Sequence, residues 1–385
     1  MKHLTTKILI FFLFILVLVS AYNYFKKPFL NKLDEVTKNV VVPTPSPTLA
    51  QKKELDIRGK IAQLLMVPID LNDLDQESSS SASMIRFVNE YHPGFVIYFG
   101  ENISSDSAML ATKNIYSQFG DGDYIPLIAV DHEGGSVQRL NGDGFSKLES
   151  WQKVVETYST AQQKAVFNQS AVELKNAGIN IVFAPVVDLA SNSAILKTRV
   201  ASNLDKTYAG ANVFINSFSQ NGIMPVIKHF PGIGSVNKDL HKAVATISLE
   251  KEDTEIFTKL LNKFTNIGVM TTHVRIENKL SGKVCSLSEE CIGKFAEFYP
   301  NVMLFTDDLS MKSALSQLGT NEEKTIEQVA IEAIDAGNNV LVFGKGVSAS
   351  SLEKVIFALQ KEYEDSDSFK KKIDNSVQKI LNLKK

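Results

Sequence analysis

The chain has 385 residues, and its 41 Lys and Arg residues nearly balance its 43 Asp and Glu residues, for a formal net charge of −2. That length allows one large domain or a few ordinary ones, while a hydrophobic share of 44% excludes a wholly disordered chain. The near-zero charge gives no reason to expect nucleic acid as a partner, and two cysteines are too few for a disulfide scaffold or a four-cysteine zinc site.

The chain begins with a strongly apolar segment. Ile8 to Phe25 provides about 18 residues without a charge, close to the minimum that crosses a bilayer, and lysines flank both ends. Basic residues before an apolar run, with Val19-Ser20-Ala21 as a small-residue cleavage site, also fit a signal peptide. We therefore expect residues 1–30 to be a membrane anchor or signal segment, and we favour the uncleaved anchor.

A Pro- and Thr-rich stretch follows the apolar segment. Residues 31–53 contain VVVPTPSPTL, in which prolines alternate with Thr and Ser. This composition favours an extended, solvated linker. We expect the folded body to occupy residues 54–385, on the outer side of a membrane or secreted from the cell.

The body alternates short apolar runs with amphipathic helical segments, such as Ser159–Ala177 and Glu322–Ala336. Apolar strands separated by helices predict an α/β fold with a parallel sheet, and eight such units predict a (β/α)8 TIM barrel. A doubly wound open sheet is the alternative, but no Gly-x-Gly-x-x-Gly follows the first run. The runs are Ile61–Val67, Phe95–Phe99, Pro126–Val130, Ile179–Ala184, Met224–Ile227, Gly268–Thr271, Val302–Phe305 and Val340–Phe343.

A TIM barrel carries its chemistry at the carboxyl ends of its strands. Polar residues that could carry chemistry follow five of the predicted strands. They are Asp131-His132-Glu133, Asp188, Lys228-His229, His273 and Asp307-Asp308. The sequence therefore predicts one site at this end of the barrel.

Asp307 and Asp308 follow the seventh run directly, where a carboxylate is held rigidly enough to serve as a nucleophile. The alternative is that one of them caps the following helix. We predict that Asp307 faces the pocket and that Asp308 supports the loop.

Asp239-Leu240-His241 lies in a polar loop after the fifth run. In extended backbone, residues i and i+2 share a face, so Asp239 could fix the tautomer of His241 and leave its other nitrogen for proton transfer. A histidine paired with a carboxylate for local order is the alternative.

Two further pairs suit the binding of hydroxyl groups. Lys228 and His229 begin a Gly- and Pro-containing loop, and Asp131 and Arg139 flank a Gly-Gly turn. Asp131 and Arg139 could hold a sugar or could form an ion pair that only shapes the loop. No HExxH motif or close histidine pair is present, so we expect no metal site.

Seven segments occur in an order and spacing that resemble glycoside hydrolase family 3, in particular its single-domain β-N-acetylhexosaminidase branch. The resemblance covers most of Glu54–Phe343. The segments are IAVDHEGGSVQRL (Ile128–Leu140), NIVFAPVVDLA (Asn180–Ala190), VIKHFPGIG (Val226–Gly234), KDLH (Lys238–His241), VMTTHV (Val269–Val274), CSLS (Cys285–Ser288) and FTDDLSM (Phe305–Met311).

The resemblance implies a retaining exo-β-N-acetylglucosaminidase that needs no cofactor. Asp307 matches the family's nucleophile, and His241, oriented by Asp239, matches the acid/base of this branch. The positions that hold the terminal sugar are matched by Asp131, Arg139, Lys228, His229 and Arg199. The implied substrate is a terminal β-linked N-acetylglucosamine of an oligosaccharide or muropeptide. We expect a monomer that meets the membrane only through its N-terminal segment.

The sequence departs from the family pattern at Ser136, Ile233, Asn339 and around Arg199. These changes leave two alternatives open: a β-glucosidase or phosphorylase of the same family, and an anchored carbohydrate-binding protein without turnover. Cys285 and Cys291 could form one bridge or remain two free thiols.

Overall fold

The computed structural model describes residues 52–74, 80–189, 196–236, 238–277, 282–319 and 322–385. The predicted membrane segment, residues 1–30, and nearly all of the predicted linker lie outside this part of the chain. Within the described residues, no helix is both long enough and apolar enough to cross a membrane.

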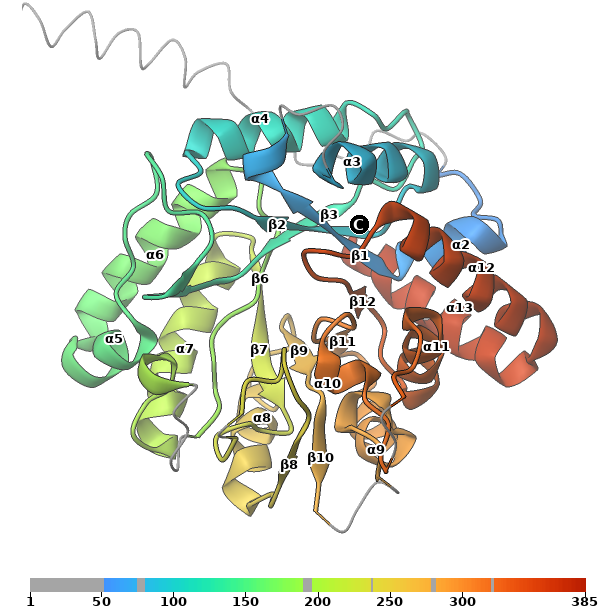
Figure 1. Ribbon diagram of the computed structural model, residues 1–385. Helices are drawn as coiled ribbons and strands as arrows, with labels where there is room; N and C mark the ends of the chain where they lie inside the picture. Colours follow the sequence, from blue (N-terminus) through green and yellow to red (C-terminus); the bar gives the residue numbers. More distant parts are fainter. Residues whose placement is uncertain (1–51, 75–79, 190–195, 237, 278–281, 320–321) are drawn as a thin grey trace, which may run out of the picture. The chain divides into compact units, whose positions relative to one another are not determined.

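Eight parallel strands form a nearly closed barrel (Figure 1). Along the sheet each strand lies beside the preceding barrel strand of the chain, whereas strand order reverses in a doubly wound sheet. A bridge between Phe305 and Val340 links the two outermost strands. The strands are β1 Leu65–Asp70, β2 Phe95–Phe99, β3 Leu127–Val130, β6 Ile181–Val182, β7 Met224–Phe230, β9 Gly268–Thr271, β11 Met303–Thr306 and β12 Leu341–Val342.

The predicted α/β class with eight parallel strands is confirmed. Predicted boundaries differ at several runs. The run Ile61–Val67 begins inside a helix, Ile57–Gln63, and its strand starts at Leu65, whereas the fifth strand continues to Phe230 and contains Lys228 and His229. The carboxylate of Asp56 accepts from the backbone N–H of Gly59 and starts that helix. The end of this helix and the start of β1 are both apolar and adjacent in the sequence, so the two elements form one continuous apolar run.

Helices surround the strands (Figure 1). Ser159, Thr325 and Ser366 cap the N-termini of three of them with their hydroxyl groups. The helices are α2 Ile57–Gln63, α3 Ser80–Tyr91, α4 Ser105–Tyr116, α5 Trp151–Thr157, α6 Thr160–Asn176, α7 Leu204–Gln220, α8 Lys251–Leu261, α9 Glu289–Phe298, α10 Lys312–Leu315, α11 Ile326–Ala336, α12 Ala349–Asp365 and α13 Asp367–Leu383.

The loops at the carboxyl ends of the strands carry small elements of their own. An antiparallel hairpin of β4 (His132–Gly134) and β5 (Val137–Gln138) follows β3. After β7 and β9, the short strands β8 (Ala245–Ile247) and β10 (Val274–Ile276) pair with each other. These elements give the loops around the barrel mouth a defined backbone.

Aromatic side chains fill the barrel interior. Phe305 lies edge-on to Phe95, with ring centroids 5.9 Å apart, and edge-on to Phe183, with centroids 5.7 Å apart. All three are buried, so the interior is a packed core that closes the site from below.

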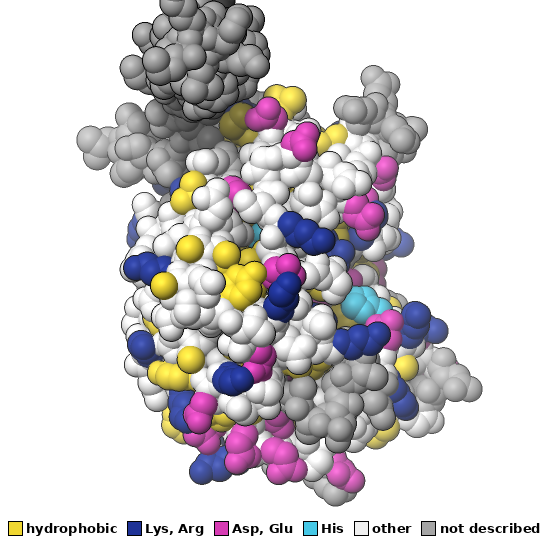
Figure 2. Space-filling view, turned by 90° about the vertical axis from the view of Figure 1, so that its left-hand side faces the viewer, with side chains coloured by type: hydrophobic (Ala, Val, Ile, Leu, Met, Phe, Trp, Pro, Cys, Tyr) yellow, Lys and Arg dark blue, Asp and Glu magenta, His cyan; other side chains and the backbone are white. Residues whose placement is uncertain are grey.

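Positive and negative side chains are interspersed over the face seen in Figure 2, and apolar side chains appear there only in small areas. This mixture fits the small net charge of the chain.

Candidate active site

A cavity of about 450 Å³ opens at the carboxyl ends of the barrel strands. All eight residues that the sequence analysis selected line this one cavity. They are Asp131, Arg139, Arg199, Lys228, His229, Asp239, His241 and Asp307. Glu133 and Asp308 line it as well, so among these ten residues positions up to 177 apart in the chain converge here.

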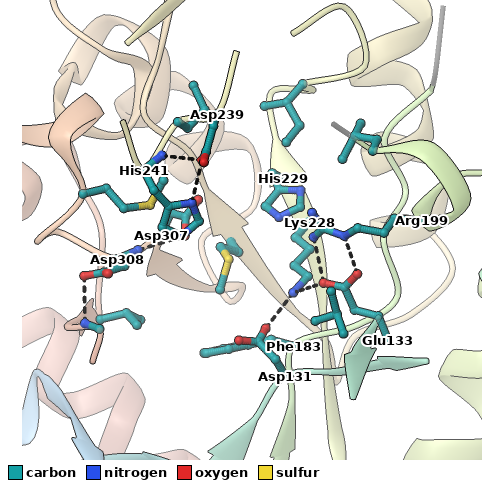
Figure 3. Close-up of a pocket in the computed structure, with 18 of the residues that line it drawn as sticks. Asp131, Glu133, Phe183, Arg199, Lys228, His229, Asp239, His241, Asp307 and Asp308 are labelled. Carbon is teal, nitrogen blue, oxygen red and sulfur yellow. Dashed lines mark hydrogen bonds and ion pairs between the residues drawn. The ribbon is translucent and has the colours of Figure 1, made fainter. Parts of the chain in front are cut away.

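Four charged side chains on one side of the cavity form an ion-pair cluster (Figure 3). The ammonium of Lys228 lies 2.7 Å from an oxygen of Asp131 and 2.6 Å from one of Glu133. Arg199 donates two hydrogen bonds to Glu133, at 2.7 and 2.8 Å. Two cations thus meet two carboxylates, and the cluster is neutral as a whole.

The ion-pair cluster shifts the ionisation of its members. Burial would raise the pKa of Glu133, but Lys228 and Arg199 lower it to about 2. Burial would lower the pKa of Lys228, yet the charges of Asp131 and Glu133 raise it above its ordinary value. Glu133, Lys228 and Arg199 therefore stay charged at neutral pH, and Asp131 and Arg199 keep exposed edges toward the cavity.

Asp131 and Arg139 do not form the ion pair that the sequence left open as one of two alternatives. The backbone N–H of Arg139 donates to the carbonyl oxygen of Asp131, but its guanidinium lies over the ring of Phe99, 5.9 Å from the centroid. Asp131 pairs with Lys228 instead. Within the described residues Arg139 forms no ion pair, and its buried Nε has no partner, so this cation faces the cavity uncompensated.

His229 is oriented by a carboxylate that the sequence analysis placed only after the fourth strand. Asp188, which is buried, lies 2.7 Å from the Nδ1 of His229. It also accepts from the backbone N–H groups of His229 and Ile233. Because a carboxylate accepts, Nδ1 carries the proton and the Nε2 of His229 is left for the cavity. The pairing of Asp188 with His229 could not be predicted from sequence spacing, because it joins the segment after β6 to the end of β7.

Asp239 and His241 form the predicted pair, but through a different backbone. The Nδ1 of His241 lies 3.0 Å from the carboxylate of Asp239, which also accepts from the backbone N–H of His241. The backbone N–H groups of Lys242 and Ala243 donate to the carbonyl of Asp239. This is a turn closed by the Asp side chain, not the extended segment that we predicted.

The imidazole of His241 is 74% exposed, whereas the neighbouring Leu240 is buried in a small apolar cluster with Ile233 and Met311. Leu240 thereby anchors the loop beneath an open imidazole. Partial burial would raise the pKa of Asp239, but the hydrogen bonds from His241 hold it below its ordinary value.

Asp307 and Asp308 lie directly after β11 and differ in their contacts. Asp307 is half-buried on the cavity wall, on the same side as Asp239 and His241 and across from the ion-pair cluster (Figure 3). Thr272 donates to one of its oxygens at 3.2 Å, and the backbone N–H of Asp308 donates to the other at 2.9 Å. Burial would raise the pKa of Asp307, but the facing His273 and His229 hold it below its ordinary value.

The carboxylate of Asp308 ties two loops together. It accepts from the backbone N–H and the hydroxyl of Ser310 and from the backbone N–H of Gly344, which follows β12. A Cβ on Gly344 would lie 1.9 Å from this carboxylate, so only glycine fits there. Asp308 therefore supports the loop, as distinct from capping the next helix.

Two of the four histidines that we noted in these loops do not line the cavity. His132 is buried, and its Nε2 lies 2.9 Å from the hydroxyl of Ser170 on α6. His273 is buried below Asp307. Among the described residues, no three His, Cys, Asp or Glu side chains are grouped as a metal site requires.

Cys285 and Cys291 form a disulfide, with Cα atoms 5.3 Å apart. It joins a short 3-10 helix, η4 (Cys285–Leu287), to the first part of α9. Of the two possibilities left open by the sequence, the structure has the bridge.

Known proteins resemble this chain over most of its length. A sequence model described as the glycosyl hydrolase family 3 N-terminal domain matches residues 56–383. A beta-hexosaminidase of Idiomarina loihiensis is 31% identical over 56% of this chain and 66% of its own length. The beta-hexosaminidase LpqI of Mycobacterium tuberculosis is 24% identical over 91% of this chain and 87% of its own. The match to the first of these spans just under two thirds of that protein.

The fold recurs among solved structures. A β-N-acetylhexosaminidase from Beutenbergia cavernae superimposes with a TM-score of 0.75 at 21% identity, over 86% of this chain and 99% of its own.

Proposed function

This chain belongs to glycosyl hydrolase family 3, and on that premise we propose that it is a retaining exo-β-N-acetylglucosaminidase. Its substrate would be a terminal β-linked N-acetylglucosamine of a cell-wall-derived or related glycan. The relatives named beta-hexosaminidase support this substrate class. One observation carries the proposal: Asp307 and the Asp239–His241 pair share one side of a cavity whose other side bears the ion-pair cluster (Figure 3).

The residues divide the chemistry into two displacements. In the first, the carboxylate of Asp307 attacks the anomeric carbon as protonated His241 gives its proton to the leaving oxygen. The bond to the aglycone breaks and a glycosyl ester on Asp307 forms. In the second, neutral His241 takes a proton from water, the resulting hydroxide attacks the anomeric carbon, and Asp307 leaves as a carboxylate.

The opposite wall would hold the terminal sugar. Asp131 and Arg199 expose polar edges already fixed by their ion pairs, so they need little reorganisation to bind hydroxyl groups. Arg139 adds a donor without a competing partner among the described residues, and the Nε2 of His229 adds an acceptor. We assign these residues, with Lys228 beneath them, to substrate binding.

The proposed nucleophile is tested by substitution and by trapping. Asp307→Ala should lower the release of 4-nitrophenol from its N-acetyl-β-glucosaminide by at least about 10³-fold, and a 5-fluoro sugar should label Asp307 in the wild type. Asp121→Asn, at an exposed turn outside the cavity, is the matched control and should retain full activity. A wild type that binds the sugar without turnover would favour a carbohydrate-binding protein instead.

His241 is tested by the dependence on the leaving group. His241→Ala should lower kcat on poor leaving groups by about 10²–10⁴-fold, and much less on dinitrophenyl glycosides, which need no protonation. Adding inorganic phosphate distinguishes the alternative activity, because an imidazole does not repel an anion. Formation of N-acetylglucosamine 1-phosphate would identify a phosphorylase, and preference for the glucoside would identify a β-glucosidase.

We also propose that the enzyme acts outside the cytoplasm, anchored through residues 1–30 or secreted. The disulfide supports this location, because such bonds persist in oxidising compartments and are rare in the cytosol. Fractionation of cells producing the full chain, with protease treatment of intact spheroplasts, tests it. Protection of the enzyme from the protease would contradict the proposal.

A further inference from the structure

Four polar side chains lie buried beneath Asp307, outside the cavity lining. Thr271, His273, Ser286 and Asn338 are each at most 1% exposed. Burying polar groups without hydrogen bonds is costly, so their arrangement calls for a physical account. They come from three segments of the chain: β9 and the residues after it, η4, and the residues just after α11.

The four side chains form a continuous chain of hydrogen bonds. The amide of Asn338 accepts from the hydroxyl of Thr271 at 2.7 Å and donates to the carbonyl of Ser286 at 2.8 Å. The hydroxyl of Ser286 lies 2.6 Å from the Nδ1 of His273. The Nε2 of His273 lies 3.0 Å from the carbonyl oxygen of Asp308.

These contacts fix the tautomer of His273. A carbonyl oxygen can only accept, so Nε2 carries a proton and donates to Asp308. Burial lowers the pKa of His273 below its ordinary value, which favours the neutral ring. Nδ1 is then an acceptor for the hydroxyl of Ser286. The carbonyl of Asp308 therefore sets the tautomer of His273, and the hydroxyl of Ser286 stabilises it by donating to Nδ1.

The two ends of Asp308 connect His273 to the proposed nucleophile. Its carbonyl accepts from His273, and its backbone N–H donates to a carboxylate oxygen of Asp307. Thr272 donates to the other carboxylate oxygen, and the backbone N–H of Asp307 donates to Thr271. The orientation of the Asp307 carboxylate thus depends on the segment Thr271–His273 and on the two successive peptide groups that flank the Cα of Asp308.

We propose that His273, with its tautomer set by the carbonyl of Asp308 and stabilised by Ser286, is a positioning residue that aims the carboxylate of Asp307 at the anomeric carbon. This inference rests on the proposed function, in which Asp307 is the nucleophile. His273 touches neither the cavity nor the substrate, and it acts through Asp308.

A pair of amide substitutions separates positioning from packing. The amide nitrogen of Gln reaches approximately the place of Nε2 and can still donate to Asp308, whereas that of Asn reaches only the place of Nδ1. We expect His273→Asn to lower kcat by about 10²-fold with little change in KM, and His273→Gln to retain most of the activity. Equal losses in the two variants, or full activity in His273→Asn, would overturn the proposal.

Two further measurements guard against a merely structural effect. Tyr98→Phe breaks another buried hydrogen bond, from Tyr98 to Thr112, and should lower Tm without lowering kcat. Imidazole ¹⁵N spectra should show the Nε2–H tautomer of His273 in the wild type, and Ser286→Ala should shift the resonance of the unprotonated Nδ1, which loses its hydrogen-bond donor. An Nδ1–H tautomer in the wild type would refute the inference. An inactive wild type would contradict the proposed function, and the spectra would then decide the inference alone.

Discussion

Glu133 is central to the charge balance of the cavity wall although it presents almost no surface. It holds Arg199 through two hydrogen bonds and meets the ammonium of Lys228. Removing one member of a buried ion-pair network leaves an uncompensated charge in a medium of low dielectric. Asp131 alone would then face two cations. The side of the cavity that we propose binds the sugar therefore depends on Glu133, which is buried behind it.

Replacing Glu133 with Gln is expected to destabilise the fold by about 3–5 kcal/mol. The folded pKa of about 2 lies below that of the unfolded chain, so the carboxylate stabilises the fold above the unfolded value. This contribution is lost as pH falls from about 5 to 2, and is on the order of 3 kcal/mol. Urea unfolding across this range should show a pH-dependent loss in the wild type that is about 3 kcal/mol larger than in Glu133→Gln, where other carboxylates such as Asp307 still contribute.

The exposed pair of Glu149 and Lys153 provides the matched control for that experiment. Glu149→Gln should change the unfolding free energy by less than about 1 kcal/mol and keep the wild-type pH dependence. If Glu133→Gln kept that dependence too, the ion-pair cluster would not be its source.

The sequence predicted which residues line the cavity better than it predicted which of them pair with each other. Asp307 and His229 could be selected because polar residues after buried strands must converge at one end of a barrel. The partners could not, because Asp188 and Glu133 meet residues of other loops. The pairing of Asp239 with His241 was predictable because it is local, and even there the backbone differed.

At the scale of elements, the loop between β10 and α9 links the disulfide to the proposed nucleophile. Cys285 and Cys291 flank Ser286, and the backbone N–H of Ser286 donates to the carbonyl of Thr272. The bridge restricts the segment that orients His273. A loop that would otherwise be tied mainly by hydrogen bonds thus gains a covalent closure.

Removing the bridge with the double variant Cys285→Ala/Cys291→Ala should destabilise the fold by about 2 kcal/mol, the loop-closure entropy for a loop this short. Denaturant unfolding of the wild type with and without a phosphine reductant should reproduce the difference. The double variant itself should not respond to the reductant. A response there would mean that the reductant acts elsewhere.

The elements were predictable where burial is uniform. Strands covered on both faces read as apolar runs, so all eight were found. Helix starts were less predictable: α11 begins at Ile326, and Thr325 is its cap, whereas periodicity alone suggested Glu322. A helix cap is a local hydrogen bond, so it does not change the spacing of the apolar residues from which the helix was predicted.

For the whole barrel domain, the last helix closes the structure against the first. α13 packs on α2 and α12, and Asp374 on α13 pairs with Lys60 on α2, 2.7 Å away. Lys384 reaches further and donates to Gln63 at 2.7 Å. Helix α2, which precedes the first strand of the barrel, is thus held by α13 and the residues that follow it.

This dependence can be measured on one helix with two substitutions. Ile373 is fully buried, and Ile373→Ala should destabilise the domain by about 2–5 kcal/mol. Leu383 is 37% exposed, and Leu383→Ala should cost less than about 1.5 kcal/mol. Ile373→Ala should lower the Tm of the whole domain in one transition, because α13 and the barrel share a core. A separate early transition for α13 would show that the helix is an appendage and that the barrel is stable without it.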